Sequence, residues 1–258
     1  MGFFLQYNRC PMHIKNYLDS TYLKTADQAS ISEAENKKIV VSTIEEAIEE
    51  QFKLVMIRPE YVALAKNLVT VSHSKVKVGT VISFPEGTHT LEEKIQEATQ
   101  AIEDGVDDLD FVCNYEAFKN GETDRVKKEI VTCTALGLKH HKTVKWIIEV
   151  AALSEKQIIQ LSALIKNCVI AHFDEANYEH VFVKSSTGFF KTENNLPNGA
   201  TVSAIKLMIE NASPLPVKAA GGVRNFEEAQ QMIRLGVKRI GTSAAKAICH
   251  GAISDADY

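Results

Sequence analysis

The sequence predicts a single-domain α/β protein of the (β/α)₈-barrel class. Short apolar runs alternate with longer amphipathic segments along the 258 residues. Most of these runs are β-branched and nearly continuous in apolarity, as expected of parallel strands that are covered on both faces. Eight such strands, each followed by a helix or by a loop with room for one, close into a barrel. An open doubly wound sheet is the alternative, and it requires fewer strands or a reversal of strand order.

Eight segments are the strand candidates, and the first of them is the shortest. They lie at residues 17–18, 54–57, 76–82, 108–112, 144–148, 181–183, 216–219 and 239–241. Helix starts can be recognised between them. Thr90 and Ser154 are each followed three positions later by Glu or Gln, which is the capping-box spacing, and Asn225 opens a third helix in the same way.

The composition indicates one soluble globular domain over residues 1–258, with an N-terminal extension at 1–13 and a flexible tail at 250–258. Apolar residues make up 45% of the chain and charged residues 24%. A net charge of -4 gives no basic surface for nucleic acid, and no apolar window approaches the roughly 18 residues of a membrane span. The N-terminus lacks the features of a signal peptide, and the five scattered cysteines are typical of a reducing compartment. We therefore expect a cytoplasmic protein.

Polar residues at the ends of the predicted strands are the candidates for chemistry, because catalytic groups of this fold stand at the carboxyl ends of strands. They are Asp19, Arg58, residues 83–87, Asp110, Lys145, Glu149, Lys184, Lys218 and residues 241–243. Three lysines on consecutive strands are unusual. A lysine in a buried strand has to place its amine somewhere hydrated, and we expect that place to be the barrel mouth.

Clustered lysines have a specific chemical use. A nucleophilic amine must be neutral, whereas a free lysine of pKa ~10.4 is almost fully protonated at neutral pH. Partial desolvation and a neighbouring ammonium both lower that pKa, and Lys218 is the predicted neighbour of Lys184. Asp110 is placed to move protons on and off the intermediates. Any one of these lysines alone is best explained as a surface amine, but the cluster favours Schiff-base chemistry.

A second signal predicts an anion site after the last strands. Gly221 and Gly222 let backbone amides turn toward an anion, and Arg224 adds a forked donor. Residues 241–243 open a short helix whose N-terminus favours negative charge, and residues 185–188 are a further candidate. Phosphate sites at these loops are frequent in this fold, and an ordinary tight turn is the alternative.

Metal and dinucleotide sites are not indicated. The eight histidines include no His-Glu-x-x-His, and no Gly-x-Gly-x-x-Gly follows a strand. Only His89 merits a test as a ligand, and a solvated loop histidine is the simpler interpretation. We expect neither a metal nor a cofactor.

Seven motifs closely resemble those of the deoxyribose-phosphate aldolase family. They are Leu-Asp-Ser-Thr at 18–21, Phe-Pro-Glu-Gly at 84–87, Asp-Asp-Leu-Asp at 107–110, Lys-Trp-Ile-Ile-Glu at 145–149, Val-Lys-Ser-Ser-Thr-Gly at 183–188, Val-Lys-Ala-Ala-Gly-Gly-Val-Arg at 217–224 and Gly-Thr-Ser at 241–243. They occur in order through almost the whole chain. The chain departs from the family pattern at Met56, where a cysteine is usual, at Val150, and in the longer approach to strand six at 167–178.

The resemblance implies a cofactor-free class I aldolase that reversibly cleaves 2-deoxy-D-ribose 5-phosphate to D-glyceraldehyde 3-phosphate and acetaldehyde, in deoxyribonucleotide catabolism. It implies that Lys184 forms the imine, that Lys218 lowers its pKa, and that Asp110 is the acid/base with Lys145 nearby. The residues it implies for the phosphate are Gly188, Gly221, Gly222, Arg224 and Ser243. The terminal Tyr258 is expected to assist proton transfer at the enamine carbon, with a frayed terminus as the alternative.

Two other functions stay open. One is a Schiff-base aldolase for another phosphosugar, which the changes at Met56 and Val150 allow. The other is a catalytically idle phosphosugar-binding barrel, although such a protein has no need of a neutral amine. Expected partners are a small sugar phosphate and acetaldehyde, with no nucleic acid and no membrane, and a homodimer is the candidate assembly.

Overall fold

In the computed structural model, which describes residues 12–193 and 196–251, eight parallel strands form one closed barrel. Strand order follows the chain, and the last strand pairs with the first. The strands are β1 (Leu18–Thr21), β2 (Leu54–Ile57), β3 (Lys77–Ile82), β4 (Asp108–Val112), β5 (Thr143–Ile147), β6 (Val181–Lys184), β7 (Val217–Ala220) and β8 (Arg239–Thr242). The predicted barrel is confirmed, and the open-sheet alternative is wrong.

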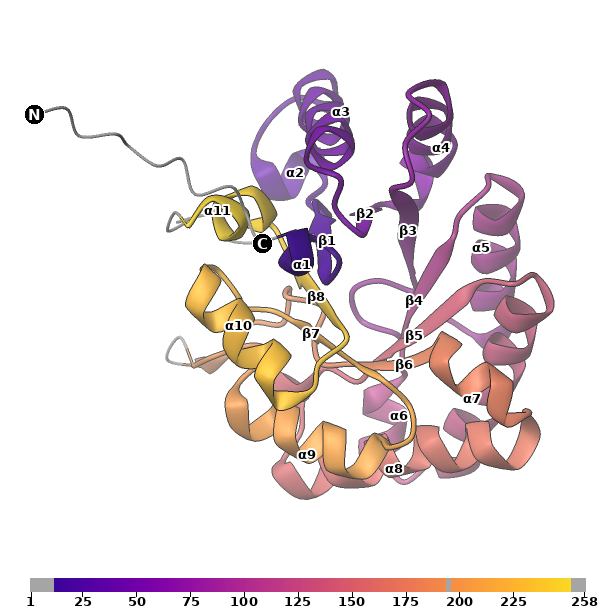
Figure 1. Ribbon diagram of the computed structural model, residues 1–258. Coiled ribbons are helices and arrows are strands. Elements are labelled where there is room, and N and C mark those ends of the chain that lie inside the picture. Colours follow the sequence, from indigo (N-terminus) through magenta and orange to yellow (C-terminus); the bar gives the residue numbers. More distant parts are fainter. Residues whose placement is uncertain (1–11, 194–195, 252–258) are drawn as a thin grey trace, which may run out of the picture.

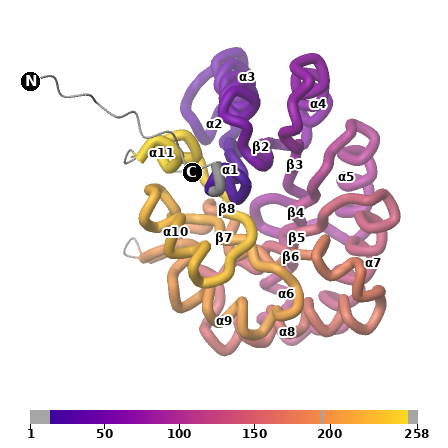
Figure 2. Tube along the Cα trace, in the orientation of Figure 1, coloured from indigo at the N-terminus to yellow at the C-terminus, as the bar shows by residue number. Residues whose placement is uncertain are grey.

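Helices surround the strands, as Figure 1 shows. They are α1 (Met12–Lys15), α2 (Ala26–Ala29), α3 (Glu33–Glu50), α4 (Val62–Val71), α5 (Leu91–Glu103), α6 (Tyr115–Lys119), α7 (Thr123–Lys139), α8 (Glu155–His172), α9 (Val202–Ala212), α10 (Phe226–Leu235) and α11 (Ala245–His250), with the 3₁₀ turns η1 (Pro59–Tyr61), η2 (Val150–Ala152) and η3 (Glu175–His180). The trace in Figure 2 runs around the ring in chain order. The last helix, α11, packs next to β1, where the barrel closes.

The helix starts agree with the capping signals in the sequence. Thr90 and Ser154 form the predicted capping boxes at the starts of α5 and α8. Asn225 caps α10 by accepting a hydrogen bond from the amide of Glu228. The Glu228 carboxylate accepts from the amide of Arg224 instead of reaching back to Asn225, so this third cap is not reciprocal.

The first strand is longer than predicted and begins one residue later. The prediction was 17–18, whereas β1 runs from Leu18 to Thr21. Asp19, Ser20 and Thr21 are polar and yet buried, because this strand supplies a charged group to the barrel interior. A search for apolar runs stops at Leu18 for that reason.

The barrel interior is apolar on one side and charged on the other. The apolar part is a small cluster of Leu23, Leu54, Met56 and Val81, contributed mainly by β2 and β3. Met56 occupies the space above Gly79, where an added Cβ would lie 2.6 Å from the Met56 Cε. The larger hydrophobic core lies outside the barrel, between strands and helices. The charged half of the interior is therefore left to the remaining strands.

The predicted extension at 1–13 and tail at 250–258 fall almost wholly outside the described residues. Within the described part of the chain, no helix is long and apolar enough to cross a membrane. Cys113, Cys133 and Cys168 are free and buried.

Candidate active site

Three lysine amines converge on the carboxylate of Asp110. The Nζ atoms of Lys184 and Lys218 each lie 2.9 Å from its Oδ2, and the Nζ of Lys145 lies 2.7 Å from its Oδ1. Strand register produces this meeting, because Asp110 is opposite Lys145 and Lys184 is opposite Lys218. The structure therefore brings together the four residues that the sequence singled out.

A second set of charges lies beneath this one. Arg239 donates from Nε to Asp19 Oδ1 at 2.8 Å, and one of its terminal nitrogens lies 3.2 Å from Asp108 Oδ2. Lys218 reaches Asp19 at 2.7 Å, and Lys145 reaches Asp108 at 2.8 Å. Asp108 and Arg239 were not among the candidate residues. The signal that could have found them is a charged side chain inside an otherwise apolar strand.

These groups are buried, whereas we expected them at the hydrated mouth of the barrel. Asp110, Lys145 and Lys218 have no exposed surface, and Lys184 is 3% exposed. Carboxylates replace water as the partners of the amines, since a buried charge has to be paired. The expectation of a hydrated location was wrong for Lys145 and Lys218.

The three lysines differ in how many carboxylates they contact. Lys145 contacts Asp108 and Asp110, and Lys218 contacts Asp19 and Asp110. Among the carboxylates that the structure describes, Lys184 contacts Asp110 alone, at the oxygen that Lys218 also uses. Lys184 is therefore the amine with the least compensation for its positive charge.

The pKa shifts follow from these contacts. Burial lowers the pKa of Lys184 to about 8, with repulsion from Lys218 and Lys145 acting in the same direction and Asp110 opposing it. Burial also acts on Lys145, but its two carboxylates outweigh it and raise its pKa. The carboxyl pKa of Asp110 lies well below its usual range, because three ammonium groups outweigh burial. With a pKa of about 8, roughly a tenth of Lys184 is neutral at pH 7, against one molecule in about 2500 for a free lysine.

Hydrogen bonds connect the loop after β6 to the end of β5. Glu149 is 1% exposed, and its carboxyl group contacts Ser186 and Thr187. Gly188 has φ +82° and donates its amide to Ser186 Oγ at 2.9 Å. The sequence pattern indicated Glu149 as a polar residue at a strand end. It did not indicate the hydrogen bond between Glu149 and Ser186, because the two residues are 37 positions apart.

Both glycines of the pair after β7 adopt the left-handed conformation. Gly221 and Gly222 have φ +83° and +84°. Gly221 also requires the absence of a side chain, since an added Cβ would lie 2.9 Å from the Cα of Gly199. Arg224 is exposed on the same loop.

Ser243 contributes to a cavity of about 330 Å³ at the carboxyl ends of β1 and β8. Thr21, Leu23 and Phe189 line the same cavity, so the loops after β6 and β8 meet there. Arg224 is not one of its lining residues. Ser243 and Phe189, the residue after Gly188, thus line one cavity, and Arg224 does not line it.

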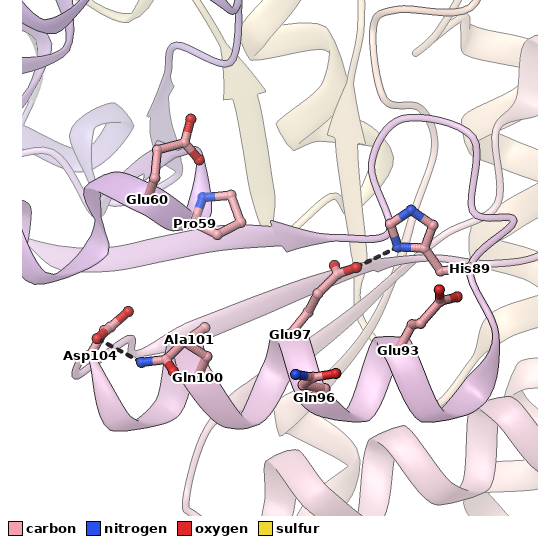
Figure 3. A pocket seen from close by; sticks show the side chains of 9 residues that line it. All are labelled: Pro59, Glu60, His89, Glu93, Gln96, Glu97, Gln100, Ala101 and Asp104. Carbon is pink, nitrogen blue, oxygen red and sulfur yellow. Dashed lines mark hydrogen bonds and ion pairs between the residues drawn. The ribbon is translucent and has the colours of Figure 1, made fainter.

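A larger cavity of about 410 Å³ lies outside the barrel, between η1 and α5 (Figure 3). Four of its nine lining residues are acidic, and the lining includes His89, whose Nδ1 contacts the Oε1 of Glu97. Among the residues that the structure describes, no group of three or more His, Cys, Asp or Glu could hold a metal ion. None of the three clustered lysines lines this cavity, so it is not the candidate active site.

The class of the protein follows from the fold and this cluster. A (β/α)₈ barrel that keeps one lysine amine partly neutral beside an ionised carboxylate is suited to covalent chemistry on carbonyl compounds. A family model described as DeoC/LacD family aldolase matches residues 17–254. The chain belongs to this family.

Proteins similar to this chain are named as aldolases. A deoxyribose-phosphate aldolase from Lactococcus lactis is 40% identical over 248 residues, covering 96% of this chain and 100% of the relative. One from Thermococcus gammatolerans is 38% identical over 242 residues, covering 93% and 97%. Among solved structures, the aldolase QR15 is similar with a TM-score of 0.74 and 31% identity over 93% of this chain and 95% of its own. A deoxyribose phosphate aldolase from Aeropyrum pernix, described as tetrameric, has a TM-score of 0.71 and 26% identity over 92% and 89%.

Removing the charge of Lys218 should raise the pKa of Lys184. In Lys218→Met the repulsion is gone and Lys184 has Asp110 Oδ2 to itself, so we expect an upward shift of about one unit, or ~1.4 kcal/mol. The pH dependence of borohydride trapping of acetaldehyde at Lys184 measures it. Lys246→Met, at an exposed lysine of α11, is the control and should leave the midpoint unchanged. A loss of rate with an unshifted midpoint would contradict this electrostatic role.

Proposed function

We propose that the protein is a class I aldolase that reversibly cleaves 2-deoxy-D-ribose 5-phosphate to D-glyceraldehyde 3-phosphate and acetaldehyde. The observation that carries the proposal is Lys184, a buried amine of lowered pKa that shares a single carboxylate with Lys218. The names of the relatives support the substrate. The reaction belongs to deoxyribonucleotide catabolism and needs no cofactor.

The proposed reaction begins when the neutral amine of Lys184 adds to the aldehyde carbon of the open-chain sugar. Loss of water gives a protonated imine. A base then removes the proton of the C3 hydroxyl group, the C2–C3 bond breaks, and its electron pair passes to the imine, which becomes an enamine. Glyceraldehyde 3-phosphate leaves, the enamine carbon takes up a proton, and hydrolysis releases acetaldehyde. Asp110 lies 2.9 Å from the Lys184 amine and moves protons to and from these intermediates, directly or through water.

The other two lysines support this step without forming the imine. Lys218 adds its repulsion to the effect of burial, and together they keep the amine of Lys184 partly neutral. Lys145 donates to Asp108 and to Asp110 Oδ1, and so holds the catalytic carboxylate in place. The 5-phosphate is bound at the ends of β6, β7 and β8, by Gly188, Gly221, Gly222, Arg224 and Ser243.

The setting of the reaction follows from the same proposal. Substrate and products are small molecules, and we infer a cytoplasmic enzyme that binds neither nucleic acid nor membrane. A homodimer is the assembly that we propose for this chain. The Aeropyrum pernix relative is described as tetrameric, so sedimentation is the measurement that distinguishes the two.

Trapping of the imine tests the proposed function. Incubation with acetaldehyde and borohydride should add one reduced two-carbon unit at Lys184, located by mass spectrometry of its peptide. Lys184→Met should lose both the label and the cleavage of deoxyribose 5-phosphate, whereas Lys246→Met should keep both. A label on Lys145 or Lys218 with Lys184 untouched would overturn the assignment.

Arg224 should matter for the phosphate and not for the bond that breaks. We expect Arg224→Ala to lower kcat/KM for deoxyribose 5-phosphate by tenfold or more, on the order of the 1.5–3 kcal/mol of a charged hydrogen bond. Turnover of unphosphorylated deoxyribose should change little. Arg234→Ala, at a basic residue in the last turn of α10, is the control. Equal losses on both substrates would place the phosphate elsewhere.

Tyr258 is the remaining residue of the proposal, and it lies outside the described residues. We propose that its phenol assists proton transfer at the methyl carbon of the enamine. Deletion of Tyr258 should slow exchange of the acetaldehyde methyl protons with deuterated water, while trapping at Lys184 continues at its normal rate. Unchanged exchange in the truncated protein would remove Tyr258 from the mechanism.

A further inference from the structure

We propose that Glu149 is a neutral carboxylic acid in the folded protein, and that in this form it holds residues 185–188 in their anion-binding shape. Glu149 follows β5 and is 1% exposed. It has φ 54°, a left-handed conformation that costs a non-glycine residue about 1–2 kcal/mol. The role in anion binding rests on the proposed function, whereas the protonation state stands on the hydrogen bonds alone.

The hydrogen bonds of Ser186 require a proton from Glu149. The Ser186 Oγ lies 2.8 Å from Glu149 Oε1, 2.6 Å from the carbonyl oxygen of Asn198 and 2.9 Å from the amide nitrogen of Gly188. A hydroxyl group has one proton and two lone pairs. The Gly188 amide donates to one lone pair, and the Asn198 carbonyl can only accept, so it takes the hydroxyl proton. The contact with Glu149 then needs a proton on Oε1.

The second oxygen of Glu149 behaves as the carbonyl oxygen of an acid. Its Oε2 accepts from the Thr187 amide at 3.0 Å and from the Thr187 hydroxyl. The Thr187 hydroxyl is itself an acceptor for the amide of Phe189, at 3.0 Å. With the proton on Oε1, every donor in this network has an acceptor. With Glu149 ionised, Ser186 would face two acceptors with one proton, and one close oxygen–oxygen contact would lack a hydrogen.

The charges around Glu149 agree with this assignment. Burial raises the pKa of the Glu149 carboxyl, and the hydrogen bonds from Thr187 and Ser186 and the charge of Lys184 oppose that effect. The titratable groups that face it are Lys184 from β6 and the Tyr115 phenol from α6. In the reactive form Lys184 is neutral, so its opposition is then absent.

A neutral acid at this position suits a loop that receives a phosphate. Glu149 fixes Ser186 and Thr187, and Ser186 in turn fixes Gly188 and the Asn198 segment. An ionised Glu149 would leave its contact with Ser186 without a hydrogen. It would also place a negative charge directly behind the loop. Glu149 is therefore a positioning residue, and its ionisation should weaken binding of a phosphorylated substrate.

Infrared difference spectroscopy tests the protonation state without reference to activity. The spectrum of wild type minus Glu149→Gln at neutral pH should contain the C=O band of a carboxylic acid. The matched control is Glu179→Gln, at a glutamate whose side chain is 81% exposed, and its difference should contain a carboxylate band. A carboxylate band in both differences would overturn the proposal. If Glu149→Gln fails to fold, Ser186→Ala replaces it, and an acid C=O band that does not shift would overturn the proposal equally.

Kinetics test the positioning role. An amide can donate to Ser186 and accept from Thr187 as the acid does, so Glu149→Gln should keep kcat/KM for deoxyribose 5-phosphate within about threefold of wild type. In wild type, KM for this substrate should rise at alkaline pH as Glu149 ionises, and Glu149→Gln should lack that rise. A rise that persists in Glu149→Gln would overturn the role. If the wild-type protein showed no imine trapping at Lys184, the proposed function would be contradicted. The infrared result on the protonation of Glu149 would still stand.

Discussion

The carboxylate of Asp110 is the group on which the charged half of the barrel depends. Four cations, Lys145, Lys184, Lys218 and Arg239, share the interior with three carboxylates, Asp19, Asp108 and Asp110. A closed barrel admits little water to compensate the extra positive charge. Release of one proton balances the set, and Lys184, with a single shared carboxylate, is the residue best placed to release it. Apolar residues of similar volume would stabilise a barrel at least as well as such a cluster, which favours a chemical reason for its presence.

Contacts outside the barrel hold β4, the strand that carries Asp110. Lys94 on α5 donates to the carbonyl oxygen of Val112 at 2.8 Å and to Glu129 on α7 at 2.7 Å. Glu129 also accepts from the amide of Asn114, at 3.2 Å. This buried pair ties two helices to the end of the strand. The position of the shared carboxylate is therefore determined from both sides of the barrel wall.

Local patterns in the sequence were enough for most of the fold, and spatial pairing accounts for the rest. Strand runs and caps such as Thr90 act over a few residues, so they can be recognised directly. Asp19 and Arg239 are partners across 220 positions, and only barrel closure brings them together. The burial of Lys218 could not be predicted for the same reason, because its carboxylate partners lie on β1 and β4. A charged residue inside an apolar strand is the one local sign of such pairing.

Asp110 and Glu149 illustrate how the surroundings set the charge of a carboxyl group. Both are buried at strand ends, on β4 and after β5, so desolvation acts on both in the same direction. Asp110 is surrounded by three ammonium groups and is ionised. Glu149 is surrounded by the hydroxyl groups of Ser186 and Thr187 and by the Thr187 amide. By the inference above, the Ser186 hydroxyl requires a proton from Glu149. The first arrangement supplies a base beside the amine of Lys184. The second leaves the neighbouring loop without a negative charge. An imine on Lys184 would need a base beside it, which is Asp110, and a phosphate on that loop would need an uncharged group behind it, which is Glu149.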